Sequence, residues 1–357
     1  MEEKKKTARE IIEGYDGPPV RIMEVCGTHT HEIFRLGIRK LLPEQVELIS
    51  GPGCPVCVTQ VGFIDEAIYL ALERQVTICT FGDLVRVPGT NMSLAGAREK
   101  GAKIRIVYSP VDAKEYAKEH PKEQVTFLSV GFETTTPSAC LSVKKAREEG
   151  LTNYSILTAN KTMPQAYEAL KGSADIFLYP GHVNAITGTK LCEELAKEGV
   201  SGVVAGFTAK ELLTALAVAL ARFQEGRPFF VNCYPRVVTE NGSPQAQKLV
   251  EEMMEPCDSE WRGLGVIKGS GMRLQEEWSA FDARKKYKIP LIQGKANPAC
   301  RCGDVLQGKC KPSDCKVFGK VCTPQHPVGA MHGVRRRCMF RVLYVRRSRE
   351  NEIKSWE

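Results

Sequence analysis

The stretch Gly51-Pro52-Gly53-Cys54-Pro55-Val56-Cys57 follows Val46-Glu47-Leu48-Ile49, a short apolar run that is typical of a β-strand. Its two glycines allow a sharp bend and a close approach of the backbone to a neighbour, and its two prolines fix φ and stiffen the loop. A helix expected over residues 59–74 would lower the pKa of the thiols through its N-terminus. The stretch therefore predicts a rigid loop at a strand end that holds two thiols together, as in a redox dithiol or half of a zinc site.

Further apolar runs alternate with helical periods through the first 225 residues. Eight of these runs are expected as strands, at 21–25, 46–49, 76–81, 104–108, 125–130, 154–158, 176–179 and 202–205. Alternating strands and helices predict an α/β fold with parallel sheets and right-handed crossovers. We expect two four-stranded parallel-sheet β/α domains, at residues 1–120 and 121–225, that face each other across a cleft.

Beyond residue 225 the alternation weakens. Helices are expected at 244–254 and 276–287, with a strand at 264–268 between them. From Asn297 onward glycine, proline and cysteine dominate, a composition typical of a small domain held together by metal rather than by a core. We expect residues 226–357 to form a helical connection and a small C-terminal iron–sulfur domain with an arginine-rich tail.

Composition and charge narrow the class of protein. Hydrophobic residues make up 43% and charged residues 26% of the 357 residues, which is typical of a soluble globular protein. No apolar run is long enough to span a bilayer, and the charged start at residues 1–6 is unlike a secretory signal, so we expect a cytoplasmic protein that does not bind membranes. The net charge of +8 comes largely from the arginine-rich tail after residue 334, so no nucleic-acid-binding surface is expected.

The chain has 14 cysteines, which in a reducing cytosol are more often ligands or redox groups than disulfides. Six crowd into 39 residues near the C-terminus: Cys300, Cys302, Cys310, Cys315, Cys322 and Cys338. These six lack the Cys-x-x-Cys pairs that zinc prefers, and their wide spacing favours an iron–sulfur cluster. Five isolated cysteines are expected as buried apolar side chains: Cys79, Cys140, Cys192, Cys233 and Cys257.

Three further groups of polar residues lie where predicted strands end. In Cys26-Gly27-Thr28-His29-Thr30-His31 the thiol and imidazole groups suit iron, zinc or copper. The alternative is that a threonine of this motif caps a helix and the histidines are exposed. Glu133 either orients a ligand or caps the next helix, and His182 follows Pro180-Gly181. Because ligands bind at the carboxyl ends of parallel strands, we expect these side chains to meet in the cleft.

In combination, these motifs resemble the HypD family of [NiFe]-hydrogenase maturation factors. The resemblance rests on CGTHTH at 26–31, GPGCPVC at 51–57, TFGDLVRVPG at 80–89, GFETTTP at 131–137, PGHV at 180–183 and the cysteine-containing stretch 302–324. The motifs occur in order over almost the whole chain, so the combination is highly specific. It implies two α/β domains and a C-terminal domain that carries a [4Fe–4S] cluster.

The resemblance also implies a function. The family provides a scaffold on which, with HypC and HypE, an iron atom receives two cyanides and one carbon monoxide. Cys26 would match the cysteine that binds this iron and links it to HypC. Cys54 and Cys57, which are also candidate metal ligands, would match the pair that exchanges electrons with the cluster. The side chains that match the family's cleft positions, and that we expect to act there, are His29, Glu133 and His182; the expected cluster ligands are Cys302, Cys315, Cys322 and Cys338.

One departure from the family pattern lies near the C-terminus. After the stretch 327–330 the family continues with a cysteine, where this chain has Met331, and the final cysteine, Cys338, is displaced by one position. A single-nucleotide frameshift near codon 330 would explain both differences, and resequencing the gene tests this hypothesis. With the printed sequence, Cys315 and Cys322 remain as cluster ligands, and the other two come from among Cys300, Cys302, Cys310 and Cys338.

Two other classes of function remain open. One is an iron–sulfur-dependent dithiol/disulfide oxidoreductase, in which Cys54 and Cys57 reduce a protein substrate. The other is a zinc-binding interaction protein without redox activity. Without the resemblance, the residues alone predict a cytosolic α/β redox metalloprotein.

Overall fold

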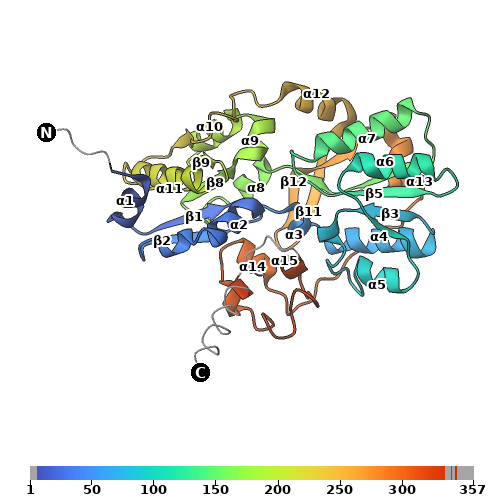
Figure 1. Cartoon of the computed structure of the whole chain (residues 1–357), viewed down its shortest axis with the longest axis horizontal. Coiled ribbons are helices and arrows are strands. Elements are labelled where there is room, and N and C mark those ends of the chain that lie inside the picture. Colours follow the sequence, from blue (N-terminus) through green and yellow to red (C-terminus); the bar gives the residue numbers. More distant parts are fainter. Residues whose placement is uncertain (1–5, 334–338, 340–341, 344–357) are drawn as a thin grey trace.

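The computed structural model describes residues 6–333, 339, 342 and 343. Its elements form three β-sheets with helices packed around them (Figure 1). Two of the sheets are parallel and are surrounded by helices, so the expected α/β class is confirmed. Among the described residues, no helix has both the length and the apolar composition needed to cross a membrane.

The larger parallel sheet has five strands in the order β10-β9-β8-β1-β2. Its strands are β10 (Phe230–Asn232), β9 (Ser201–Ala205), β8 (Ile176–Pro180), β1 (Val20–Glu24) and β2 (Val46–Ser50). The elements around it are α1 (Ala8–Glu13), α2 (Gly27–Arg35), η1 (Ile38–Lys40), α8 (Pro164–Ala169), α9 (Gly181–Thr187), α10 (Lys190–Lys197) and α11 (Ala209–Phe223). Side chains alternate between the faces of the sheet: Ile22 and Leu178 pack in a cluster with α1 and α11, whereas Met23 and Tyr179 belong to a second cluster.

The smaller parallel sheet has four strands in the order β4-β3-β5-β6. These strands are β4 (Ile104–Ile106), β3 (Thr77–Thr80), β5 (Val125–Ser129) and β6 (Tyr154–Thr158). Its helices and turns are α4 (Val61–Glu73), η2 (Gly82–Leu84), α5 (Leu94–Glu99), α6 (Pro110–Glu119) and α7 (Thr136–Glu148). Every residue of β3, β5 and β6 is buried, as expected for parallel strands that are covered on both faces.

The membership of the two parallel sheets differs from the prediction of two four-stranded units. The first two strands, β1 and β2, pair with β8 and its neighbours, and the next two, β3 and β4, pair with β5 and β6. The chain therefore leaves the five-stranded sheet after β2, completes the four-stranded sheet and then returns. The sequence locates each strand but not its neighbours, because every buried parallel strand has the same kind of apolar run. The domain limits at residues 120 and 225 stay a prediction.

A third, antiparallel sheet joins β11 (Met254–Trp261), β12 (Gly265–Leu274) and β7 (Asn160–Lys161). β11 is not predicted from the sequence, because only its two end residues are buried and no run of alternating apolar residues marks it. β12 extends the strand expected at 264–268. The two expected helices appear as α12 (Pro244–Met253) and as a pair, η3 (Glu276–Phe281) and α13 (Ala283–Lys286).

The C-terminal segment has little regular structure, as its composition predicts. Its described elements are α14 (Cys302–Leu306), η4 (Pro312–Asp314) and α15 (Ala330–Gly333). Figure 1 shows α14 and α15 beside α3 (Pro55–Val58), between the two parallel sheets, and α15 contacts α3. The segment that holds the C-terminal cysteines therefore lies next to the dithiol loop, while most of the arginine-rich tail lies outside the described residues.

The loops that follow β1 and β2 touch each other. The two strands are paired in parallel along their whole length, so both loops start at the same edge of the sheet. The Gly27 N–H donates a hydrogen bond to the Gly53 carbonyl at 2.9 Å. A Cβ atom on Gly53 would lie 2.0 Å from the Cys26 nitrogen and 2.0 Å from the Val25 carbonyl carbon, far inside normal contact distance. Glycine at position 53 therefore allows the two cysteine motifs to meet.

We expect Gly53→Ala to destabilise the protein by ~3 kcal/mol or more, because backbone atoms on both sides must move to accommodate the methyl group. Thermal unfolding followed by circular dichroism measures this loss. Gly96→Ala in α5 is the matched control, since its Cβ would meet the nearest heavy atom, Met92 Cβ, at an ordinary 3.4 Å and alanine favours a helix. Equal melting temperatures for the two variants would contradict the proposed steric requirement.

Candidate functional site

Cys26 lies at the end of β1 and is the N-cap residue of α2. Its side chain is 1% exposed, and its carbonyl accepts hydrogen bonds from the Thr30 N–H at 3.0 Å and the Thr30 hydroxyl at 3.1 Å. No side chain in the described structure caps this helix. The alternative in which a threonine caps the helix and the histidines are exposed is therefore wrong, since His29 is fully buried.

His29 is held by the loop that follows β9. Its Nε2 lies 3.0 Å from the Gly206 carbonyl and 3.3 Å from the Ala205 carbonyl. Because a carbonyl only accepts, Nε2 carries the proton and Nδ1 carries a lone pair. Nδ1 is buried and has no hydrogen-bond partner among the described residues. Burial, reinforced by nearby His182, lowers the pKa of His29 to about 4, so at pH 7 the neutral ring can bind a metal or accept a proton.

His182 lies in α9, directly after β8. The Phe207 ring packs against both histidines, with centroids 4.8 Å from His29 and 5.1 Å from His182. Burial lowers the pKa of His182 to about 4, so this ring is also neutral at pH 7. The adjacent strands β1, β8 and β9 thus bring the two predicted histidines together around one aromatic ring.

Glu133 comes from the loop after β5, in the other parallel sheet. Its Oε1 accepts a hydrogen bond from the Met163 N–H at 2.8 Å, at the start of α8. It does not cap α7, the helix that follows it, so the predicted capping role applies to a different helix. Its Oε2 is buried and has no partner among the described residues, and burial raises the pKa of Glu133 to about 7.

Tyr167 in α8 is a site residue that sequence reasoning did not single out. It is 3% exposed, and its hydroxyl has no hydrogen-bond partner in the described structure. Burial raises the pKa of Tyr167 well above its usual value, and electrostatic effects of Cys192, Glu133 and Cys26 add to the rise. Tyr167 is therefore within electrostatic range of both Glu133 and Cys26. No sequence pattern marks it, because one tyrosine in a short helix usually serves the core.

Three buried polar atoms of the residues described above have no hydrogen-bond partner in the described part of the chain. They are His29 Nδ1, Glu133 Oε2 and the Tyr167 hydroxyl. Buried polar atoms in native proteins nearly always have a hydrogen-bond partner, and exceptions often mark a ligand or ion site. The arrangement offers a soft thiol, a neutral imidazole lone pair and two oxygen groups, which suits a bound metal with small polar ligands.

Cys57 lies in the short helix α3, and Cys54 directly precedes this helix. Cys54 is its N-cap residue, and the Cys57 N–H donates to the Cys54 carbonyl at 3.1 Å. The helix expected from about Thr59 appears as α4, which begins at Val61, and a separate short helix that was not predicted, α3, already includes Cys57. The two side chains are 8% and 1% exposed, so the dithiol is enclosed by the protein.

Arg262, at the turn after β11, is a second residue that the sequence analysis missed. Its backbone N–H donates a hydrogen bond to the Val58 carbonyl at 2.8 Å, and its side-chain Nη1 donates one to the Pro88 carbonyl at 3.0 Å. Burial lowers the pKa of Arg262, and this effect is opposed by Cys300, Cys302 and Cys57, which act on the guanidinium electrostatically. The buried cation therefore lies between the dithiol and the C-terminal cysteines.

The C-terminal cysteines gather around the backbone of residues 328–331. A Cβ on Gly329 would lie 2.4 Å from the Cys300 sulfur and 2.7 Å from the Cys302 sulfur. A hydrogen bond with Cys302 lowers the pKa of Cys300 to about 6. Cys322 accepts a hydrogen bond from the Val328 N–H at 3.3 Å and is influenced electrostatically by Cys300 and Cys315.

The structure therefore brings three of the four predicted cluster cysteines near one another, namely Cys302, Cys315 and Cys322. Cys300, which sequence reasoning gave only as an alternative, joins them, and Cys338 lies outside the described residues. Within the described part of the chain, no three or more His, Cys, Asp or Glu side chains are arranged as a metal site. The donor chemistry and the N–H groups directed at sulfur nevertheless fit a thiolate-bound cluster.

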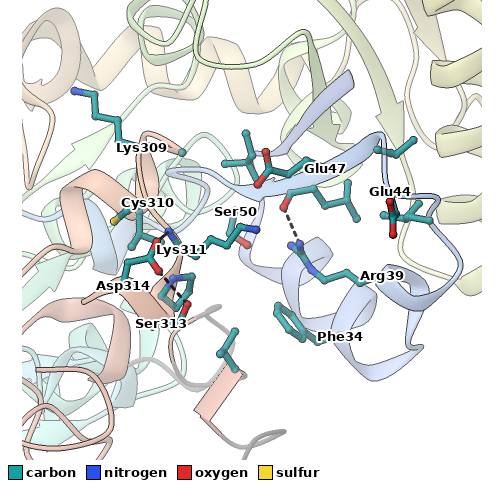
Figure 2. A pocket seen from close by; sticks show the side chains of 18 residues that line it. Phe34, Arg39, Glu44, Glu47, Ser50, Lys309, Cys310, Lys311, Ser313 and Asp314 are labelled. Carbon is teal, nitrogen blue, oxygen red and sulfur yellow. Dashed lines mark hydrogen bonds between the residues drawn. The ribbon is translucent and has the colours of Figure 1, made fainter. Parts of the chain in front are cut away.

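A pocket of about 800 Å³ lies elsewhere, between the edge strand β2 and the C-terminal segment (Figure 2). Figure 2 shows Arg39 on its wall, where Nη1 donates to the Leu48 carbonyl at 2.7 Å and so covers part of the strand edge. Cys310 also lines this pocket, whereas Cys26 and His182 are not among its lining residues. The pocket is therefore separate from the candidate iron site.

We expect His29 and His182 to stay neutral down to about pH 4 in the folded protein. Because an unfolded histidine has a pKa near 6.5, the unfolded chain binds more protons between pH 6.5 and 4, and stability falls as the pH is lowered through this range. For fully buried His29 the loss is ~3 kcal/mol. NMR titration of ¹³C-labelled histidines checks this, with His182→Gln to assign one signal and exposed His326→Gln as the control. Protonation of both rings near pH 6.5 would contradict the expectation.

Comparisons with known proteins show the family to which the chain belongs. A family model named HypD, described as the hydrogenase formation hypA family, matches residues 2–338. The hydrogenase maturation factor HypD of Escherichia coli strain K12 is 42% identical over 321 residues, covering 88% of this chain and 86% of that protein. The factor of the same name from Cupriavidus necator is 40% identical over 331 residues, covering 89% and 87%. The chain therefore belongs to the HypD family of hydrogenase maturation factors.

Proposed function

We propose that the protein is a cytoplasmic scaffold on which, together with HypC and HypE, the Fe(CN)₂CO unit of [NiFe]-hydrogenase is assembled. The observation that carries the proposal is that buried Cys26 occurs together with three unpartnered buried polar atoms: His29 Nδ1, Glu133 Oε2 and the Tyr167 hydroxyl. The iron is cargo in this scheme, bound by the Cys26 thiolate and passed on when its ligands are complete.

The surrounding residues have distinct roles in this proposal. His29 offers a neutral Nδ1 toward the cargo because its Nε2 proton is fixed by the backbone carbonyls. Glu133 has a pKa of about 7, so it holds or releases a proton near neutral pH as the charge of the cargo changes. His182 and Phe207 keep His29 in place and exclude water from this side of the site.

Cys54 and Cys57 serve as the redox pair of the scaffold. When their thiols form a disulfide, two electrons and two protons are released, and reduction takes up the same number. A [4Fe–4S] cluster held by cysteines that include Cys302, Cys315 and Cys322 would pass these two electrons, one at a time, between the pair and an external one-electron carrier. The position of Arg262 between the two groups of cysteines supports such an exchange.

The burial of the dithiol argues against a simple oxidoreductase that reduces a protein substrate. Such enzymes need an attacking sulfur that the substrate disulfide can reach. Cys57 is 1% exposed and Cys54 is 8% exposed, so a second protein would reach neither sulfur without rearrangement. Electron exchange inside the chain is consistent with this geometry.

Cys26→Ala should remove the cargo iron from the complex co-purified with HypC. We expect iron affinity at this site to fall ~10-fold or more and the infrared cyanide and carbonyl bands to vanish, because the thiolate ligand is lost. Cys233→Ala, which removes a half-buried cysteine from the edge of the five-stranded sheet, is the matched control. Unchanged infrared bands in Cys26→Ala would overturn the assignment of this cysteine.

Replacing either cysteine of the dithiol by alanine should block hydrogenase maturation in cells, because a single remaining thiol cannot form the disulfide. Complementation of a strain that lacks its own maturation factor, read as hydrogenase activity, measures this. Cys140→Ala, at a fully buried position in α7, controls for the loss of a thiol from the core. Normal maturation with Cys54→Ala would exclude the redox role.

A further inference from the structure

Lys161 in β7 is a fully buried lysine that has no role in the proposed function. Its Nζ donates hydrogen bonds to the Ser259 hydroxyl at 2.5 Å, the Glu260 carbonyl at 2.8 Å and, over a longer 3.4 Å, the Gln60 Oε1. These three oxygens match the three donors of an ammonium group. Burial lowers the pKa of Lys161 to about 7, and Cys257 and Glu260 oppose this effect electrostatically. The lysine therefore ties together segments that are far apart in the sequence.

The side chain of Lys161 crosses the middle strand of the antiparallel sheet. Lys161 is paired with Gly271 in β12, and Gly271 is paired in turn with Cys257 in β11. A Cβ atom on Gly271 would lie 2.8 Å from the Ser259 Cβ, so the space above this glycine is already narrow. Glycine at position 271 therefore leaves room for the lysine to reach the last residues of β11.

The end of β11 is bound to the segment that contains the end of the dithiol helix α3. Residues 58–60 run antiparallel to residues 260–262: a backbone hydrogen bond of 2.8 Å joins the pair 58 and 262, and Thr59 and Trp261 form an antiparallel bridge. Lys161 Nζ contacts both members of the third pair, 60 and 260. The lysine therefore closes the short pairing that holds the dithiol helix against the antiparallel sheet.

The backbone at Lys161 contacts the loop that carries Glu133. The Lys161 N–H donates to the Gly131 carbonyl at 2.9 Å, and the Met163 N–H donates to the Glu133 carboxylate at 2.8 Å. Segment 161–163 thus contacts the Glu133 loop through its backbone and the dithiol segment through the lysine side chain. Both contacts fix the place from which the lysine acts.

We propose that Lys161 is a positioning residue for Cys54 and Cys57, which holds α3 in the conformation in which the two sulfurs form a disulfide. The inference rests on the proposed function, which assigns this pair its redox role. When the disulfide forms, the two thiols lose two electrons and two protons, and oxidised glutathione takes them up to become two glutathione thiols. Because a fixed backbone brings the two sulfurs together at little cost in entropy, loss of the lysine contacts makes the disulfide less favourable.

The test measures the equilibrium constant for oxidation of the dithiol by glutathione in the full chain. It compares the wild type with Lys161→Met, which removes the donors but keeps a long side chain, and with Ser259→Ala, which removes one acceptor. Lys268→Met, at an exposed lysine of β12, is the matched control. Alkylation and peptide mass spectrometry report the fraction of Cys54–Cys57 disulfide, and circular dichroism checks the fold.

We expect the equilibrium constant to fall ~10-fold in Lys161→Met, because several hydrogen bonds are lost, and ~3-fold in Ser259→Ala, where one is lost. Lys268→Met should match the wild type. If Lys161→Met does not fold, Ser259→Ala alone decides. An unchanged constant in either folded variant, a shift toward the disulfide, or an equal fall in Lys268→Met would overturn the inference and leave the redox role in place. A wild type that forms no Cys54–Cys57 disulfide would instead overturn the redox role of the proposed function, and the inference with it.

Discussion

The site depends on the close approach of two backbone loops, at Gly53 and Cys26. A parallel sheet brings the ends of neighbouring strands to one edge, but side chains normally keep the following loops apart. Here the absence of a Cβ at position 53 allows the dithiol loop to lie directly on the Cys26 backbone. The relative position of the two cysteine motifs is therefore set by main-chain contact, which side-chain motion does not alter.

This constraint explains how the folded protein tolerates buried polar atoms that have no hydrogen-bond partner. Each buried polar atom without a partner costs ~1–3 kcal/mol. His29 Nδ1, Glu133 Oε2 and the Tyr167 hydroxyl come from both sides of the interface between the two parallel sheets. The surrounding core, which includes residues of both sheets, holds these groups in place. A ligand that forms hydrogen bonds with these three atoms gains binding free energy, and little entropy is lost because the side chains are already held in place.

The sequence allowed a prediction of the strands and of the motifs at their ends, because buried strands and glycine-rich loops leave clear local patterns. It did not allow a prediction of which strands share a sheet: β1 and β2 join β8 through contacts between residues about 150 positions apart. Tyr167 and Arg262 were missed for the same reason, since each is an ordinary residue type whose role comes from distant neighbours. No role was predicted for His332 either, although its Nδ1 lies 3.2 Å from the Cys322 sulfur.

The charge around Arg262 bears on how the two groups of cysteines interact. Burying a guanidinium costs folding free energy unless negative charge lies nearby. Among the described residues, Arg262 forms no ion pair with a carboxylate. The Asp65 carboxylate accepts hydrogen bonds from Thr90 instead. Cys300, Cys302 and Cys57 act on the guanidinium electrostatically, as does Asp65. Oxidation of an ionised dithiol removes negative charge on one side, so Arg262 then favours added negative charge on the other side, where the proposed cluster would take up an electron. In the proposed scheme, electron transfer from the dithiol toward a cluster would therefore keep negative charge close to this buried cation.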